Sequence, residues 1–277
     1  MIDYLIVGHV AKDVTPDGFR LGGTVSYAGL TALRLGARVG IVTATGPDVD
    51  VAARLSEADV RVVKSPETTT FENRYGPDGR RTQRLLARAR PIGIADIPSD
   101  WRRAPIVHLA PLAGEFGPEL LLHFADAGVV ALTPQGWMRT WDRNGVVDPT
   151  DPPPLSPAAR KRLDVVVVSD ADFGYRWDVI ERYARGYRLA IVTRGEHGAR
   201  LYADSRAVDF PAYRSAVVDP TGAGDVFAAA FLLRLTETRD CHEAVDFANC
   251  AASLSIEGIG TSSLPDLAAI LARRSRR

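Results

Sequence analysis

The segment that most constrains this chain runs from Val217 to Leu235 and reads V-V-D-P-T-G-A-G-D-V-F-A-A-A-F-L-L-R-L. A glycine-containing turn at 219–224 leads into residues 226–233, which are apolar without a break. A surface helix carries one apolar stripe, whereas a helix that is apolar on all sides is buried. The sequence therefore predicts a buried helix whose N-terminus follows a glycine-rich turn.

The start of this predicted helix is a candidate anion site. The first N–H groups of a helix lack partners within the helix, and an anion can accept them. Gly222 and Gly224 have no side chains, so a phosphate could approach the backbone closely there. Asp225 would repel that phosphate, which makes sense if it takes a proton from an attacking hydroxyl. The alternative is a simple turn in which Asp225 caps the helix.

The complete D-P-T-G-A-G-D, followed by a buried helix, resembles the signature of the ribokinase-like (PfkB) family of carbohydrate and nucleoside kinases. The resemblance implies a catalytic base at Asp225 and an anion hole formed by Gly222, Ala223 and Gly224. It also implies ATP as phosphoryl donor, together with Mg²⁺.

The residues implied for the donor lie in the C-terminal half. Thr193, Gly195 and Gly198 match the family's T-x-G-x-x-G nucleotide loop, whose backbone can meet phosphate oxygens. The resemblance places Asn249 beside the adenine, although plain helix packing is an equal alternative. A monovalent cation such as K⁺ is implied near Asp219 and Thr221.

The implied Mg²⁺ position departs from the family pattern. Many relatives carry N-x-x-E after the strand that corresponds to 165–168, whereas this chain reads S-D-A-D. Asp172 keeps the spacing and one carboxylate, and Asp170 competes with it for the role.

The residues implied for the acceptor lie in the N-terminal half and near residue 135. Asp13 follows the first strand at the family's spacing, where a carboxylate can accept hydrogen bonds from two neighbouring hydroxyls. The backbone of Gly22 and Gly23 would approach the acceptor. Gln135 and Arg139 follow a later strand, and an arginine there could clamp the transferring phosphate.

Two further positions depart from the family. Tyr27 stands where ribokinases proper usually carry Asn, which argues against a ribose-type hydrogen-bond pattern. Thr133 stands where the family motif usually has Asp.

Residues 68–97 predict a β-hairpin that stands outside the main sheet, with G-P-D-G as its turn. In the resembling family such strands form a lid over the acceptor. The segment T-T-x-F-E-x-x-Y is similar to the branch that contains myo-inositol kinases, which favours a polyol. A surface hairpin or a homodimer contact is the alternative.

Elsewhere short apolar runs alternate with helical patterns, as in a parallel sheet covered on both faces. We expect strands at 4–7, 39–43, 106–110, 129–132, 165–168 and 189–193, and an amphipathic helix including 120–125. The prediction is one α/β domain over 1–277, with the three-layer ribokinase-like fold, a mostly parallel central sheet and a small β lid.

The composition argues against a nucleic acid or a membrane as the binding partner. Lys and Arg together number 34, as do Asp and Glu, so the formal net charge is zero. A nucleic-acid or membrane surface would need a basic excess. Cys241 and Cys250 lie too far apart on one predicted helix to form a disulfide, and the chain starts without a basic leader. A reduced, cytoplasmic protein is the simplest interpretation.

The predicted function is transfer of the ATP γ-phosphoryl group to a hydroxyl of a small carbohydrate or polyol. A nucleoside kinase of the same fold is one alternative, and a nucleotide- or sugar-binding regulatory protein without turnover is another. An NAD-dependent dehydrogenase would need G-x-G-x-x-G after the first strand, and G-H-V-A-K-D lacks it.

Overall fold

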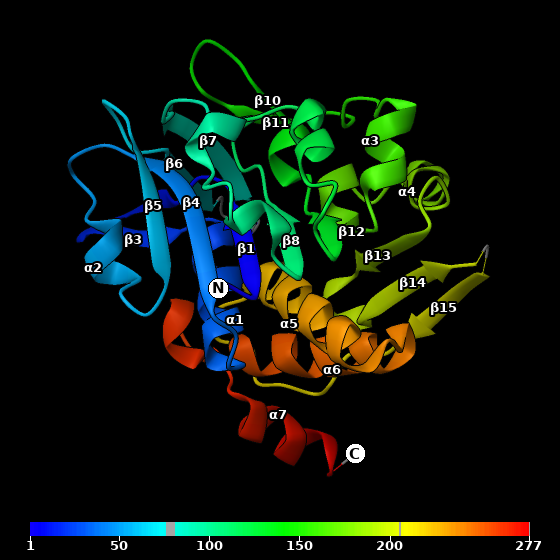
Figure 1. The fold of residues 1–277 in the computed structure, drawn as a ribbon. Coiled ribbons are helices and arrows are strands. Elements are labelled where there is room, and N and C mark those ends of the chain that lie inside the picture. Colours follow the sequence, from blue (N-terminus) through cyan, green and yellow to red (C-terminus); the bar gives the residue numbers. More distant parts are fainter. Residues whose placement is uncertain (76–80, 205, 277) are drawn as a thin grey trace.

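A computed structural model describes residues 1–75, 81–204 and 206–276. Within these residues nine strands form one sheet in the order β15-β14-β13-β12-β9-β8-β1-β4-β5 (Figure 1). The strands from β13 to β5 are parallel, and β14 and β15 add an antiparallel edge. The predicted α/β class and mostly parallel sheet are confirmed. The strands are β1 (Tyr4–Val7), β4 (Val39–Thr45), β5 (Asp59–Lys64), β8 (Ile106–Leu109), β9 (Val129–Leu132), β12 (Val165–Ser169), β13 (Leu189–Thr193), β14 (Ala199–Ala203) and β15 (Arg206–Phe210).

Helices cover both faces of this sheet and give three layers (Figure 1). One face packs against α1 (Thr24–Arg34), α5 (Ala223–Thr238) and α6 (Cys241–Ser255). The other face packs against α3 (Pro157–Arg162), α4 (Trp177–Ala184) and several 3₁₀ turns. Two short helices complete the chain, α2 (Val51–Arg54) near the sheet edge and α7 (Leu267–Arg274) at the C-terminus. None of the helices in the described ranges is long and apolar enough to cross a membrane.

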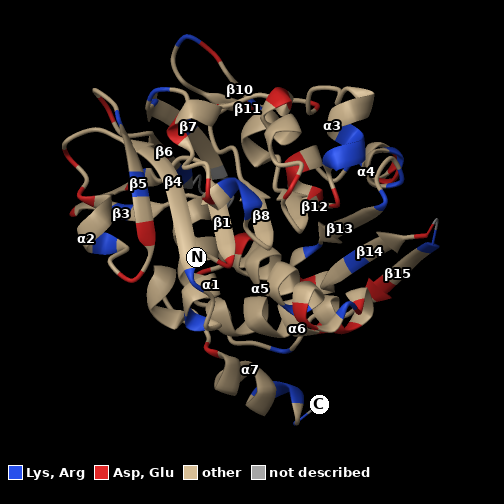
Figure 2. Cartoon of the chain, in the orientation of Figure 1, with Lys and Arg blue, Asp and Glu red and all other residues tan. Residues whose placement is uncertain are grey.

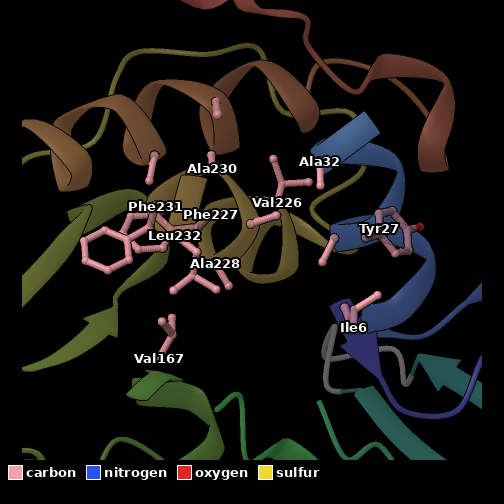
Figure 3. Packing of buried hydrophobic residues seen from close by; sticks show 14 of the residues in the cluster. Ile6, Tyr27, Ala32, Val167, Val226, Phe227, Ala228, Ala230, Phe231 and Leu232 are labelled. Carbon is pink, nitrogen blue, oxygen red and sulfur yellow. The ribbon is translucent and has the colours of Figure 1, made fainter. Parts of the chain in front are cut away.

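The α5 helix is the centre of the larger core. Its residues Val226 to Leu232 are fully buried, as the uninterrupted apolar run predicts. Figure 3 shows Val226, Phe227 and Phe231 packed between α6 and the strands. Burying each such large side chain contributes about 1.5–3 kcal/mol. This packing fixes α5, and therefore fixes the position of its N-terminus.

A second, four-stranded sheet stands outside the main one, in the order β3-β2-β6-β7. Its strands are β2 (Ala11–Thr15), β3 (Gly18–Gly22), β6 (Thr70–Tyr75) and β7 (Arg81–Ala87). The predicted hairpin within 68–97 is confirmed in β6 and β7, while its turn at 76–79 lies outside the described residues. We call this four-stranded sheet the lid. The sequence did not predict β2 and β3. A short hairpin, β10 (Arg139–Trp141) with β11 (Val147–Pro149), adjoins β7.

The predicted amphipathic α-helix around 120–125 is wrong. Residues Pro118–His123 form a 3₁₀ helix instead. The segment is only six residues long, and nucleating an α-helix over so few residues is unfavourable. Leu120 and Leu121 still bury their side chains in the core, which is what the apolar pattern reflects.

The Glu115 carboxylate ties two strand ends together beneath the lid. It is fully buried and accepts hydrogen bonds from the backbone N–H groups of His9, Leu112 and Ala113 at 2.6–3.0 Å. His9 follows β1 and the other two follow β8, so this one side chain fixes the loops at the carboxyl ends of both strands. A carboxylate suits this place because the groups that it contacts here are N–H donors.

We expect Glu115→Gln to lower the free energy of unfolding by about 2–4 kcal/mol, because its amide would present N–H groups to backbone donors. Urea unfolding measures this loss. The control is Glu119→Gln, an exposed glutamate that accepts the Gly117 N–H. A surface change of this kind is expected to stay within about 0.5 kcal/mol. Equal effects in the two variants would contradict the assigned role of Glu115.

Candidate active site

Asp225 lies in the first turn of α5, with Gly222 as the N-cap in the left-handed conformation at φ 80°. Its carboxylate is half-buried and accepts a hydrogen bond from the Thr24 hydroxyl. Burial raises the pKa of Asp225 to about 6, against the opposing effects of the Thr24 hydrogen bond and the Arg139 charge. Asp172 and Asp13 raise this pKa further through their negative charges. A carboxylate tuned in this way can exchange a proton near neutral pH.

These electrostatic partners come from four separate parts of the chain. Asp13 is on β2 of the lid, Arg139 begins β10, Asp172 follows β12, and Asp225 is on α5. Because each of the first three acts on the charge of Asp225, the fold brings all four into one neighbourhood. Asp13 was predicted for the acceptor, Arg139 for the phosphate and Asp172 for the metal. All three lie around the predicted base.

The two glycines at the tip of α5 have different surroundings. A Cβ on Gly222 would lie 2.1 Å from the Tyr27 ring, so only glycine fits between this ring and the turn. A Cβ on Gly224 would meet nothing within 4 Å. The helix tip is therefore packed against Tyr27 on one side and open at Gly224, where an anion can reach the backbone.

On the acceptor side, the glycine pair makes room for Asp13. A Cβ on Gly22 would lie 2.0 Å from the Asp13 Oδ2, and one on Gly23 would lie 2.7 Å from the His9 carbonyl oxygen. Gly23 also has φ 88°, which a side chain disfavours. The Arg139 guanidinium lies 5.6 Å from the centroid of the Phe71 ring on the lid. Gln135 is half-exposed in a 3₁₀ turn that precedes Arg139.

The donor-side predictions separate into open and packed positions. Thr193 ends β13, and Gly195 has φ 52° with open space where a Cβ would be. A Cβ on Gly198 would lie 2.0 Å from the Phe210 carbonyl oxygen, so this glycine permits close packing of the loop. Asn249 is buried, and its amide donates to the Phe210 carbonyl oxygen at 3.4 Å. These contacts give Gly198 and Asn249 packing roles, whereas Gly195 remains accessible.

The predicted cation ligands lie in two places. The Asp172 carboxylate accepts the Ser169 N–H at 2.9 Å and lies within electrostatic reach of Asp225. Asp219 instead accepts the N–H groups of Thr221 and Gly260, which joins two loops. Across the part of the chain that the structure describes, no three carboxylate, His or Cys side chains converge on one point. A single carboxylate at this place is compatible with Mg²⁺, which commonly takes one or two carboxylates with substrate phosphates and water.

Several residues of this region were not predicted from the sequence. Thr24 was not singled out, although it begins α1 directly after the glycine pair. His108 was not singled out either, and it contacts Tyr4 and Thr133. No local sequence signal marks these contacts, because the pairs are 104 and 25 residues apart.

Comparisons with known proteins agree with this geometry. Residues 176–267 match the family model described as "pfkB family carbohydrate kinase". Cytidine kinase of Thermococcus kodakarensis is 28% identical over 264 residues, which cover 88% of this chain and 92% of that protein. Inositol 3-kinase of Oryza sativa subsp. japonica is 28% identical over 287 residues, which cover 94% of this chain and 69% of that protein.

A solved structure extends the comparison over the whole fold. It is that of a pyrophosphate-dependent myo-inositol-1 kinase converted by two substitutions into a myo-inositol-3 kinase. The two chains superpose with a TM-score of 0.81 at 26% identity, and the match covers 97% of this chain and 98% of the other. The family model, the kinase relatives and the shared fold together show that this chain is a kinase with the ribokinase-like fold, whose residues 176–267 match the PfkB family.

Proposed function

We propose that this kinase transfers the γ-phosphoryl group of ATP to a hydroxyl of a small polyol or sugar. The observation that carries the proposal is Asp225, whose pKa is raised by burial to about 6 at an accessible helix N-terminus, with Asp13 and Arg139 acting on its charge. A base with this pKa is largely ionised at neutral pH and can accept the proton of an attacking alcohol.

In this mechanism Asp13 accepts hydrogen bonds from the acceptor and orients one hydroxyl toward the phosphorus. Asp225 takes the proton of that hydroxyl while the hydroxyl oxygen attacks the γ-phosphorus in line, the bond from this phosphorus to the bridging β-phosphate oxygen breaks, and ADP leaves. The N–H groups from Gly222 to Asp225 donate to the transferring phosphoryl group, and Arg139 adds a positive charge beside it. The α5 dipole favours an ionised Asp225, and burial opposes this, so the two effects set a moderate basicity.

Kinases of this family use ATP with Mg²⁺, and Asp172 is the residue that we assign to the metal. When bound, Mg²⁺ would neutralise charge on the phosphates. The Asp219 carboxylate, with the turns at Thr221 and Gly260, is the proposed position for a monovalent cation.

The lid supports a polyol as acceptor. Asp13 pairs with Phe71 across β2 and β6, and the Asn73 and Gln83 amides hydrogen-bond to each other at 2.9 Å on neighbouring lid strands. By strand alternation Asn73 and Gln83 share the face of Phe71 and Leu85. This face offers carboxylate and amide groups that suit several hydroxyls. The two inositol kinase relatives favour the same class, whereas the cytidine kinase relative keeps a nucleoside as the alternative.

Pyrophosphate is the second candidate donor, because the structural relative at 26% identity is described as pyrophosphate-dependent. Three exposed apolar side chains favour ATP over pyrophosphate, because ATP has a base that they could contact. They are Val217, Val218 and Ile259. The Val218 N–H donates to the Ile256 carbonyl oxygen, so the two loops that carry these side chains adjoin beside Asp219. An apolar surface at this place could cover a nucleotide base.

The testing experiment combines two donors, Mg-ATP and Mg-pyrophosphate, with a panel of polyols, sugars and nucleosides. Phosphate monoester is detected directly by ³¹P NMR, so one assay serves both donors. We expect ATP with a polyol or sugar to give the highest kcat/KM. A preference for nucleosides would overturn the acceptor, a preference for pyrophosphate would overturn the donor, and no product with any pair would favour the regulatory alternative.

The pKa of Asp225 predicts how activity depends on pH. Because the ionised form is the base, kcat/KM should fall about tenfold per pH unit below pH 6 and level off above it. Arg139 lowers this pKa, so Arg139→Gln should move the fall to higher pH. The control is Arg143→Gln, an exposed arginine on the same hairpin, which should leave the profile in place. A profile that does not move in Arg139→Gln would assign the fall to another group.

A further inference from the structure

A buried chain of three polar side chains runs beneath the active site. The Tyr4 hydroxyl lies 2.6 Å from His108 Nδ1, and His108 Nε2 lies 3.0 Å from the Thr133 hydroxyl. Tyr4 and His108 are fully buried, whereas Thr133 keeps 8% of its surface exposed. This hydrogen-bonded series is therefore buried at Tyr4 and reaches the protein surface at Thr133.

One arrangement of the protons satisfies all the hydrogen bonds among these three side chains. Burial lowers the pKa of His108 to about 3, so the ring is neutral and has one donor and one acceptor nitrogen. If Tyr4 donates to Nδ1, then Nε2–H donates to Thr133, and the Thr133 proton remains to be donated. The opposite arrangement would leave the Tyr4 proton without an acceptor among the described residues, at a cost of about 1–3 kcal/mol. The first arrangement is favoured, and it makes Thr133 a donor.

Thr133 is placed where such a donor can meet the reacting groups. Ile106 on β8 and Ala131 on β9 face the core under α5, so by strand alternation His108 and Thr133 face the same side. Thr133 directly follows β9, at the edge of the sheet where β12 leads to Asp172. Burial raises the pKa of Tyr4, and the negative charge of Asp225 raises it further. The three hydrogen-bonded side chains therefore lie close to the proposed base.

The order of the strands indicates which ligand Thr133 meets. On one side of β9 lie β12 and β13. They lead to Asp172, proposed for the metal, and to Thr193, proposed for the phosphoryl donor. On the other side lie β8 and β1, which lead toward the lid and Asp13. The end of β9 thus lies between the proposed phosphoryl-donor residues and the proposed acceptor residues, where the phosphoryl group would pass.

We propose that the Thr133 hydroxyl donates a hydrogen bond to a non-bridging oxygen of the transferring phosphoryl group, and that His108 and Tyr4 hold it in the donating orientation. This inference rests on the proposed phosphoryl transfer. It gives Thr133 direct contact with the reacting group and makes His108 and Tyr4 positioning residues.

The first test compares Thr133→Val with Thr133→Ser. Valine keeps the shape of threonine but has no hydroxyl, so kcat should fall by about 10- to 100-fold, the range for a lost hydrogen bond to a charged oxygen. Serine keeps the hydroxyl and should recover kcat to within about fivefold of the unchanged protein. A normal kcat in Thr133→Val, or a rise only in the KM for the acceptor, would overturn the contact with the phosphoryl group.

The second test separates positioning from simple stability with a double-mutant cycle. Tyr4→Phe removes the donor to Nδ1 and frees His108 to accept the Thr133 proton, so kcat should fall by about 3- to 10-fold. In the Thr133→Val background the same change should alter kcat by less than about twofold, because no hydroxyl remains to orient. Equal losses in both backgrounds would overturn the positioning role.

The unchanged protein distinguishes this inference from the proposed function. If it forms phosphate monoester and Thr133→Val is equally active, the inference alone fails. If it forms no monoester with any donor and acceptor, the proposed function fails first. Urea unfolding of each variant is measured alongside, so that kcat is compared only between folded proteins.

Discussion

Asp225→Asn is expected to lower kcat by about 10²–10⁴-fold, the range for loss of a general base. Asparagine has the same shape and can still accept the Thr24 hydrogen bond, but its amide cannot take up the acceptor proton. Because the backbone N–H groups of the helix tip are unchanged, the Kd for the phosphoryl donor should remain within about threefold. Steady-state kinetics and calorimetric titration of the donor measure the two quantities.

The matched control is Asp240→Asn, at the N-cap of α6. Its carboxylate accepts the N–H groups of His242 and Glu243, and asparagine is an equally good cap. We expect kcat in this variant to stay within about twofold of the unchanged protein. If Asp225→Asn also kept normal turnover, Asp225 would not be the base.

Gly224→Ala is expected to give a stable protein with about 10²-fold lower kcat/KM. Its Cβ would meet no atom of another part of the described protein within 4 Å, and alanine in a helix is favoured over glycine by about 1 kcal/mol. The free energy of unfolding should therefore be unchanged or slightly higher. The methyl group would occupy the space assigned to the phosphoryl group, and displacing that group by about 1 Å should cost about 10²-fold in kcat/KM.

Gly222→Ala provides the contrast within the same turn. Its Cβ would lie 2.1 Å from the Tyr27 ring, and φ is 80°, so this variant should lose about 1–3 kcal/mol of stability from strain. Kinetics and urea unfolding of both variants separate the two effects. A fully active and stable Gly224→Ala would show that the phosphoryl group does not lie against this residue.

The sequence predicted the parts of the fold that carry continuous apolar runs. The bounds of β1, β9 and β13 agree with the prediction, and the buried part of α5 follows the run from Val226. The lid strands β2 and β3 were missed, because Lys12, Asp13 and Arg20 interrupt any apolar alternation. The two strands pair with each other as a local antiparallel hairpin, and only the pairing of β2 with β6, some 60 residues away, has no signal in the local pattern.

The candidate site was predictable where its residues share one motif. Asp225 and its glycines are consecutive in the chain, and the fold brings Asp13, Arg139 and Asp172 to them. The contact of Tyr27 with Gly222, and the chain from Tyr4 to Thr133, depend on packing between distant elements. Asn249 was predicted beside the adenine, with helix packing as the alternative, and its amide donates to the Phe210 carbonyl oxygen at the end of β15.

The charges are distributed without one dominant sign. Figure 2 shows Lys and Arg interspersed with Asp and Glu over the helices and strands in view. This agrees with the zero formal net charge and with a small-molecule acceptor bound by local contacts. The acceptor is therefore expected to be selected by the groups of the lid rather than by a long-range field.

The central claim is that the open tip of α5 receives the transferring phosphoryl group while Asp225 faces the acceptor hydroxyl. A crystal structure of the complex with Mg²⁺, a non-hydrolysable ATP analogue and the preferred polyol tests it most directly. We expect a terminal phosphate oxygen within hydrogen-bond distance of the backbone nitrogens between Gly222 and Asp225, and one polyol hydroxyl within about 3 Å of the Asp225 carboxylate. A terminal phosphate bound elsewhere, with the polyol away from Asp225, would contradict the account.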